Sequence, residues 1–273
     1  MPELPEVETT RQGITPFVSG ASITDVIVRN SRLRWPIPPN LESTIRGLTI
    51  MGVERRAKYL LFDLQQGWLL WHLGMSGSLR ALTTPQAPGK HDHVDISLNN
   101  GNILRYRDPR RFGCLLWIPD DWRHHALLQH LGPEPLSPDF TGPILLTALK
   151  NRKVAIKIAI MDAHIVVGVG NIYANEALFR AKLNPRTPAQ HLTLTQCIRL
   201  VSEIKQLLHE AIAAGGSSLR DYVNSQGDAG YFQQNYAVYN RKDQACRDCA
   251  TPISTLTQGQ RTTFYCAQCQ PEC

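Results

Sequence analysis

The chain has 273 residues, of which 42% are hydrophobic, so it is long enough to bury the core of one large domain or of two. No apolar run approaches the roughly 18–20 residues that cross a bilayer, and Glu3 stands where a secretory signal would carry Lys or Arg. We therefore expect a soluble cytoplasmic protein, and its net charge of +6 favours a polyanionic partner without identifying one.

The opening residues, "MPELPEVETT", predict a helix over about 5–19. Pro5 suits the first turn of a helix, where Glu6 and Glu8 would face the positive end of the helix dipole. This helix leaves Pro2 without a structural explanation.

Pro2 has a second interpretation, which depends on the initiator methionine. The small residue that follows Met1 permits its removal. Pro2 would then be a free secondary amine with the carboxylate of Glu3 beside it. The start of the chain therefore offers a nucleophile, and the rest of the sequence decides whether it is used.

Residues 22–118 contain short stretches rich in β-branched and aromatic residues, which predict strands. They are "ITDVIVRN", "VERRAKYLLFDL", "GWLLWHLG", "HVDISL" and "NILRYR". Asn100-Gly101 lies between the last two and is a strong hairpin signal. Several short strands separated by turns indicate a β-sandwich or a barrel rather than a parallel sheet.

The segment 101–113, "GNILRYRDPRRFG", interleaves arginines with aromatic residues. Arg105 and Arg107 would share one face of a strand, and the turn that follows would present Arg110, Arg111 and Phe112 at a loop tip. Arginines bind phosphates, and an exposed aromatic ring can enter a base stack. The alternative is a solvated arginine face around a core phenylalanine.

Two glycine-rich turns display single residues of interest. "WHLGMSGSL" (71–79) displays Met75, although a methionine taken alone is more often a core residue than a functional one. "VVGVGNIYANEALF" (166–179) places Asn171 where a helix begins, and the backbone amides at such a helix start favour a phosphate.

The proline-rich segment "LGPEPLSPDFTGP" (131–143) ends the strand pattern, and we interpret it as a linker. Beyond it the pattern is helical, most clearly over 194–214. Thr193 and Gln196 fit a capping box there, and Gly215-Gly216 fit its end. The apolar positions of this helix recur every three or four residues, at Ile198, Val201, Ile204, Leu208, Ala211 and Ile212.

Near the end of the sequence, Cys246-x2-Cys249 and Cys266-x2-Cys269 are separated by sixteen residues. Two such pairs can place four thiolates tetrahedrally around one structural Zn²⁺, with a hairpin turning near Gln258-Gly259 between them. Two disulfides are the alternative, and the missing secretion signal argues against them. The other cysteines, Cys114, Cys197 and Cys273, are expected to be plain thiols.

Together these motifs resemble the formamidopyrimidine-DNA glycosylase family. The resemblance runs in order through "PELPEVET", "RRAKYLL", "HLGMSGSL", "KHDHVD", "DPRRFG", "LGPEPL", "VGVGNIYANEALF", "GYF" and "QRTTFYC". It covers essentially the whole chain, and the combination is far more specific than any single motif.

The resemblance implies an α+β fold in which an N-terminal β-sandwich with flanking helices precedes a helix–two-turns–helix module and a zinc ribbon. We therefore expect a sandwich domain over 1–131, a linker over 132–143, a helical DNA-binding domain over 144–238 and a zinc ribbon over 239–273. It also implies a DNA glycosylase with abasic-site lyase activity. Such an enzyme acts, as a monomer, on oxidised purines and abasic sites in double-stranded DNA of the bacterial nucleoid.

The resemblance also implies site residues. Pro2 matches the nucleophile, Glu3 its acid–base partner, Lys58 a second catalytic residue and Arg261 the residue for δ-elimination. The family's residues that contact the DNA backbone correspond to His91, Arg110, Arg152 and Asn171. The residues that fill the gap left by the extruded nucleotide correspond to Met75, Arg110 and Phe112. "GGSSLRDY" (215–222) matches a loop that closes over the damaged base.

Elementary chemistry favours Pro2 over Lys58 as the nucleophile. An α-amine has a pKa near 7.7–8.0 and lysine one near 10.4, which gives the α-amine on the order of a few hundred times more free base at neutral pH. The greater basicity of a secondary amine narrows this margin, and burial widens it again.

Two other interpretations stay open from the sequence. One is a glycosylase of the endonuclease VIII type, which prefers oxidised pyrimidines. The other is a zinc-containing protein that binds nucleic acid without catalysis. The complete trio of Met75, Arg110 and Phe112 favours the purine enzyme, and the intact Pro2 and Glu3 favour catalysis.

Overall fold

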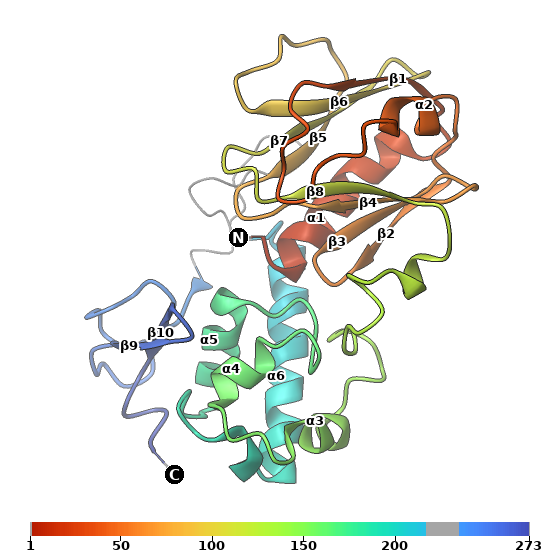
Figure 1. Ribbon diagram of the computed structural model, residues 1–273. Coiled ribbons are helices and arrows are strands. Elements are labelled where there is room, and N and C mark those ends of the chain that lie inside the picture. The colour runs from red at the N-terminus through yellow and green to blue at the C-terminus, as the bar shows by residue number, and fades with distance from the viewer. Residues whose placement is uncertain (1, 217–234, 273) are drawn as a thin grey trace. The chain divides into compact units, whose positions relative to one another are not determined.

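The computed structural model describes residues 2–216 and 235–272. These residues form two compact units (Figure 1). The first contains residues 2–129 together with 214–216, and the second contains residues 130–213 together with 235–272. The predicted division into four segments stays a prediction. Among the described residues, no helix has the length and apolar character needed to span a membrane.

The first unit is built from two four-stranded antiparallel sheets, as predicted for a β-sandwich. One sheet has the order β1-β6-β7-β5 and the other β2-β3-β4-β8. The strands are β1 (Ile23–Val28), β2 (Gly52–Arg56), β3 (Tyr59–Asp63), β4 (Trp68–His72), β5 (Ser78–Leu82), β6 (Asp92–Leu98), β7 (Ile103–Arg107) and β8 (Cys114–Ile118).

The core of this unit lies between the sheets, because alternate residues of each strand face inward. Phe62 and Trp71 come from one sheet and Tyr106 from the other, and all three are fully buried. The rings of Trp71 and Tyr106 meet edge to face with centroids 5.4 Å apart.

Helix α1 (Leu4–Val18) packs on the edge strands β5 and β2, one from each sheet. It begins one residue earlier than predicted, so that Pro5 is its second residue. Glu6 accepts a hydrogen bond from the backbone N–H of Glu3 at 2.8 Å, as in a capping box. The helix therefore fixes the backbone that directly follows Pro2. Two short helices, α2 (Leu41–Ile45) and η1 (Trp122–His124), complete the unit.

The hairpin predicted at Asn100-Gly101 is confirmed, with Gly101 at a φ of 86° between β6 and β7. The stretch 53–64, predicted as one strand, instead forms the β2–β3 hairpin with Ala57-Lys58 at its turn. Ala57 has a φ of 54°, in a region where the usual signal would be glycine or asparagine. The sequence contains no such signal here.

The second unit is helical with a small hairpin. Its helices are α3 (Gly142–Leu149), α4 (Ile156–Ile160), α5 (Asn171–Arg180), η2 (Ala189–His191) and α6 (Leu194–Ala213). Helix α6 packs on α3 and α5, and strands β9 (Ser254–Gln258) and β10 (Arg261–Tyr265) pair antiparallel with β10 on α5. The hairpin turns at Gly259-Gln260, one residue beyond the predicted position.

The prediction for α6 holds with one exception. Val201, Ile204, Leu208 and Ala211 are buried and Ile212 is half-buried, but Ile198 is 52% exposed. Gly142 of α3 lies against Ile198, since a Cβ on Gly142 would be 2.4 Å from the Cγ1 and 2.8 Å from the Cα of Ile198. Part of the Ile198 side chain therefore lies in the contact between the two helices, and the rest is exposed.

Candidate functional site

Pro2 and Glu3 are both buried at the start of α1, and the side chain of Glu6 beside them is 1% exposed. Gly216 lies against this helix start, since a Cβ on it would be 3.4 Å from the Oε1 of Glu6. Gly216, which belongs to the first unit, therefore lies at the start of α1. The rest of the loop predicted over 215–222 lies outside the described residues.

Lys58 occupies the β2–β3 turn rather than a strand, and α1 holds that turn in place. Arg55 donates to Glu8 of α1 at 3.1 Å and to the carbonyl of Ala57 at 3.0 Å. Burial raises the pKa of Glu8, but its hydrogen bond to Arg11 and the charges of Arg11 and Arg55 outweigh burial and hold the pKa below its ordinary value. A permanently charged pair thus connects the turn that carries Lys58 to the helix that carries Glu3.

His72, which sequence reasoning missed, lies at the end of β4 close to Lys58. Burial, the charge of Lys58 and the charge of Arg34 lower its pKa to about 4. Its Nδ1 accepts the backbone N–H of Gly74 at 3.0 Å, and its ring lies 4.9 Å from that of Tyr59. A neutral imidazole therefore supports this part of the site. The sequence marks His72 only as a strand residue before a glycine.

The low pKa of His72 predicts a pH dependence of stability. In the unfolded chain His72 is protonated near pH 6.5, whereas in the folded protein it is protonated only near pH 4. The free energy of unfolding therefore falls as the pH drops through this window. Between pH 7.5 and 5 this loss is about 2 kcal/mol. His72→Asn, which keeps an acceptor for Gly74, should remove most of that slope in urea unfolding. An equal slope in both proteins would contradict the prediction.

Asp108 organises the loop between β7 and β8. It is fully buried and accepts hydrogen bonds from Tyr106 Oη at 3.0 Å and from the backbone N–H of Gly113 at 2.9 Å. It also accepts from Ser76 Oγ and the backbone N–H of Arg110, both at 3.2 Å. One carboxylate therefore links the turn of Met75 to the loop of Arg110 and Phe112. The sequence suggested only a turn at this aspartate.

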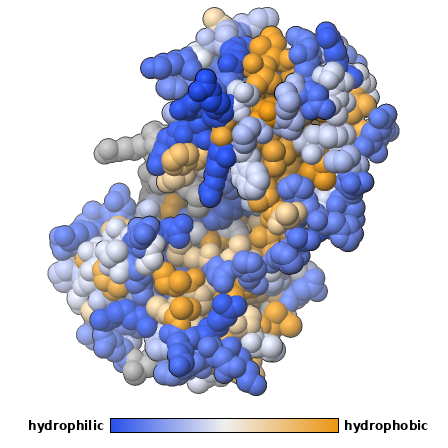
Figure 2. Space-filling view, viewed as in Figure 1, coloured by the Kyte–Doolittle hydropathy of each residue, from blue (hydrophilic) through white to orange (hydrophobic). Residues whose placement is uncertain are grey.

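The residues displayed by these two turns suit contact with a ligand. Met75 is 38% and Phe112 43% exposed, so both large apolar side chains are accessible to a ligand. The guanidinium of Arg110 lies 4.8 Å from the centroid of the Phe112 ring. His91 is half-buried, and its carbonyl accepts the backbone N–H of Asp108 at 3.0 Å, so it belongs to the same cluster. Figure 2 shows a mainly hydrophilic surface in which apolar residues gather in separate areas.

Arg105 does not join this surface, although the sequence grouped it with the other arginines. It is 3% exposed and donates twice to Asp95 of the neighbouring strand, at 2.8 and 2.7 Å. Burial raises the pKa of Asp95, but its hydrogen bonds to Arg105 and Arg29 lower the pKa by more, so that the net shift is downward. Arg105 is therefore part of a buried ion pair of the sheet, and neither a phosphate ligand nor a solvated residue.

In the second unit, Asn171 and Arg261 come together at the start of α5. The Nδ2 of Asn171 donates to the carbonyl of Thr262 at 3.0 Å. Lys157, a fully buried lysine of α4 that sequence reasoning missed, contacts the same carbonyl at 3.5 Å and donates to Thr263 Oγ1 at 2.8 Å. These contacts position the exposed Arg261 at the first residue of β10. Arg152 is also exposed, with Asp162 at 3.6 Å.

The four predicted zinc ligands lie together. Their sulfur atoms are all within 4.8 Å of one another, with Cys246 and Cys269 at 3.9 Å and Cys249 and Cys266 at 3.4 Å. A tetrahedral Zn²⁺ with Zn–S bonds near 2.3 Å requires sulfur atoms about 3.8 Å apart. The donor set and its spacing therefore fit one structural zinc ion.

Glu176 of α5 connects this ribbon to the helices. It is 1% exposed and accepts the backbone N–H groups of Ala237, Val238 and Tyr239 at 2.7–2.9 Å. Three backbone donors thus take the place of water around this buried side chain. The chain that enters the ribbon is thereby fixed to the helix that begins at Asn171.

Comparison with known protein families gives matches along nearly the whole chain. Residues 1–115 match the formamidopyrimidine-DNA glycosylase N-terminal domain, residues 131–223 match the H2TH domain of that enzyme, and residues 243–271 match a zinc finger found in FPG and IleRS.

Relatives and solved structures agree with these matches. The chain is 58% identical to the formamidopyrimidine-DNA glycosylase of Thiobacillus denitrificans, covering 99% of this chain and 100% of that protein. The crystal structure of MutM (Fpg) from Thermus thermophilus covers 99% of both chains with a TM-score of 0.89 and 37% identity. The complex of Lactococcus lactis Fpg with abasic-site DNA covers 99% of this chain and 100% of that one, with a TM-score of 0.91 and 32% identity.

Proposed function

The chain belongs to the formamidopyrimidine-DNA glycosylase family, and from this premise we propose how its own residues carry out the reaction. It is a base excision repair enzyme that removes oxidised purines from double-stranded DNA and cleaves the strand as a lyase. The observation that carries the residue assignment is the burial of Pro2 and Glu3 at a helix start that is tied, through Glu8 and Arg55, to the turn of Lys58. We place the enzyme in the bacterial cytoplasm, associated with the nucleoid through DNA.

The reaction begins with extrusion of the damaged nucleotide, because its glycosidic bond is inaccessible inside a stacked duplex. Met75 and Phe112 are the exposed apolar side chains that would fill the vacated stack, and Arg110 at 4.8 Å from the Phe112 ring would face the unpaired base. Unstacking costs a few kcal/mol, which such inserted side chains offset.

Pro2 then supplies the nucleophile. Its nitrogen lone pair forms a bond to C1′ while the C1′–N9 bond breaks, and the base leaves with the electrons of that bond. The N–H proton that Pro2 then loses is the one the departing base takes up, which frees the nitrogen lone pair for the next step. Glu3 donates a proton to the sugar ring oxygen as the C1′–O4′ bond opens, which is general acid catalysis. The result is an iminium between Pro2 and C1′.

The iminium drives strand cleavage because, having formed from a secondary amine, it has no N–H to lose. Its positive charge persists and acidifies the C2′ proton. Loss of that proton expels the 3′ phosphate, and a second elimination expels the 5′ phosphate. Lys58 and Arg261 would stabilise the negative charge on the sugar and the phosphates in these steps.

His91, Arg110, Arg152 and Asn171 are proposed to contact the DNA backbone. Asn171 would do so at the start of α5, where the helix dipole favours an anion. Zinc would be held by Cys246, Cys249, Cys266 and Cys269. Its contribution is to fold the ribbon that carries Arg261, and no step of the reaction uses it.

The lesion class is tested by comparing excision from otherwise identical duplexes. We expect 8-oxoguanine opposite cytosine to be excised at least about tenfold faster than thymine glycol, since a site that hydrogen-bonds one base discriminates strongly against another. The reverse preference would assign an endonuclease VIII type of glycosylase. Failure to cut an abasic site would leave a DNA-binding protein without catalysis.

A further inference from the structure

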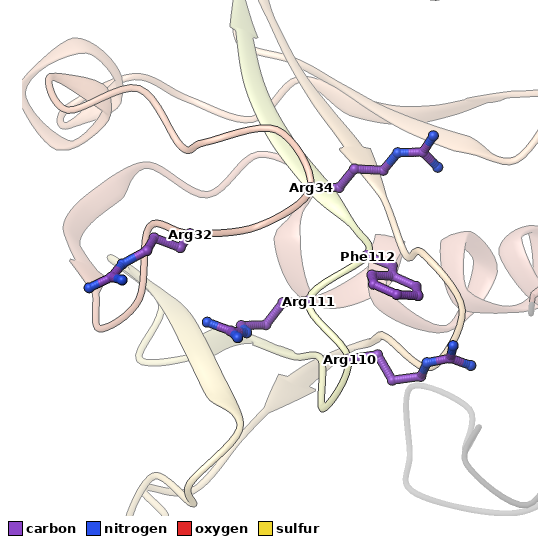
Figure 3. Close-up of a pocket in the computed structure, with 5 residues that line it drawn as sticks. All are labelled: Arg32, Arg34, Arg110, Arg111 and Phe112. Atoms are coloured by element: carbon purple, nitrogen blue, oxygen red, sulfur yellow. The ribbon is translucent and has the colours of Figure 1, made fainter.

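Two loops of the first unit form a hollow lined by four arginines. The hollow has a volume of about 540 Å³ and is lined by Arg32, Arg34, Arg110, Arg111 and Phe112. We call it the arginine hollow (Figure 3). Arg110 and Phe112 have proposed roles above. Arg111 was expected only in general terms to bind phosphate, and Arg32 and Arg34 have no role so far.

The hollow is built by the fold. Leu33 and Ile37 are buried and anchor the loop after β1, which leaves the side chains of Arg32 and Arg34 exposed. The backbone N–H of Arg34 donates to the carbonyl of Gly113 at 3.2 Å, which joins this loop to the one that Asp108 organises. The two walls of the hollow are therefore connected by a hydrogen bond.

The charges in the hollow are not balanced by the protein. Across residues 2–216 and 235–272, no carboxylate pairs with any of its four guanidinium groups, and the hollow has no acidic lining residue. Most other arginines of the first unit pair with a carboxylate. These are Arg11, Arg29, Arg46, Arg55, Arg105, Arg107 and Arg123. Four like charges around one cavity repel one another unless an anion lies between them.

The two ends of the hollow face different ways. The backbone of Arg34 is hydrogen-bonded to Gly113, whose neighbour Cys114 pairs with His72, and His72 pairs with Tyr59 next to Lys58. Arg34 therefore lies on the side of the proposed catalytic turn. Figure 3 shows Arg111 pointing toward Arg32, while Phe112 lies between Arg34 and Arg110. When a side chain enters the base stack, the phosphates of one strand lie on one side of it and those of the other strand lie on the opposite side.

We propose that Arg32 and Arg111 bind the phosphates of the strand opposite the lesion, which deepens the proposed function and rests on it. The hollow is larger than one phosphate group, so it accommodates two successive phosphates with a sugar between them. This contact would hold the undamaged strand in register while Phe112 occupies the stack. It also gives the otherwise unexplained Arg32 a place in substrate binding.

The test is the salt dependence of binding to a duplex that carries a tetrahydrofuran abasic analogue, which cannot be cleaved. The variant is Arg32→Ala with Arg111→Asn, because Arg111 has a φ of 58° that asparagine tolerates. Each lost phosphate contact lowers the slope of log K against log salt by about 0.9. Between 50 and 200 mM salt, the variant should therefore lose about tenfold less affinity than the parent protein. Arg46→Ala, an exposed arginine paired with Asp25 and Glu42, is the control and should keep the parent slope.

Neutral methylphosphonate linkages then identify the strand. Placed opposite the lesion, they should weaken binding by the parent protein and leave the double variant almost unaffected. An unchanged salt slope in the variant, or an effect confined to linkages in the lesion strand, would overturn the proposal. Covalent trapping at Pro2 reports the proposed function separately, since neither Arg32 nor Arg111 takes part in that chemistry.

Discussion

A form of the protein that keeps Met1 will excise no damaged base and cut no strand, although it will still bind DNA. The nitrogen of Pro2 would then be an amide, whose lone pair is delocalised and not nucleophilic. Loss of a covalent nucleophile lowers the reaction rate by at least about a thousandfold. An uncleaved tag before Pro2 provides this form, and nicking of an 8-oxoguanine duplex measures it.

Two comparisons make this prediction specific. The same chain with Pro2 confirmed by mass as its first residue should be active, and both forms should bind a tetrahydrofuran duplex with affinities within about threefold, because the phosphate contacts dominate affinity. Pro2→Gly, which keeps a terminal amine after methionine removal, should retain measurable cleavage. Nicking by the tagged form at the parent rate would show that another residue is the nucleophile.

Loss of zinc should have the second large effect. The ribbon's buried cluster contains Phe179, Val238 and Ile253 together with two of the cysteines, Cys246 and Cys266, so it has almost no core of its own. Binding of a structural Zn²⁺ contributes about 10–16 kcal/mol in such small domains. Cys266→Ser should therefore unfold the ribbon and lower the zinc content below one per chain.

The consequence for function follows from the contacts of the ribbon. Thr262 and Thr263 hold Arg261 in position through Asn171 and Lys157, and these contacts require a folded hairpin. We expect cleavage at an abasic site to fall at least about a hundredfold, by analogy with loss of a charge-stabilising group. Cys197→Ser, at a buried thiol of α6 outside the cluster, should keep both zinc and activity. Full activity in a zinc-free protein would contradict the assigned role of the ribbon.

Several features could be predicted from sequence because their causes are local. The spacing of the two cysteine pairs is enough to predict a zinc site, and Asn100-Gly101 favours a hairpin through its own backbone preferences. Helix α6 follows from its apolar period, but that period does not show that Ile198, which contacts Gly142 of another helix, stays 52% exposed.

The features that were missed depend on contacts between distant residues. The turn at Lys58 has no glycine or asparagine, and the Arg55–Glu8 pair that connects it to α1 spans two elements. Arg105 is buried because β6 and β7 place Asp95 directly opposite it, a register that no local pattern contains. The support that His72 gives likewise arises from burial in the folded sandwich.

The most direct test of the central claim is covalent trapping with borohydride on a duplex that carries one 8-oxoguanine. Borohydride reduces the iminium to a stable amine, and mass mapping then identifies the attached peptide. We expect one cross-linked peptide, beginning at Pro2. A cross-link at Lys58, or none with protein confirmed to lack Met1, would contradict the assignment of Pro2 as the nucleophile.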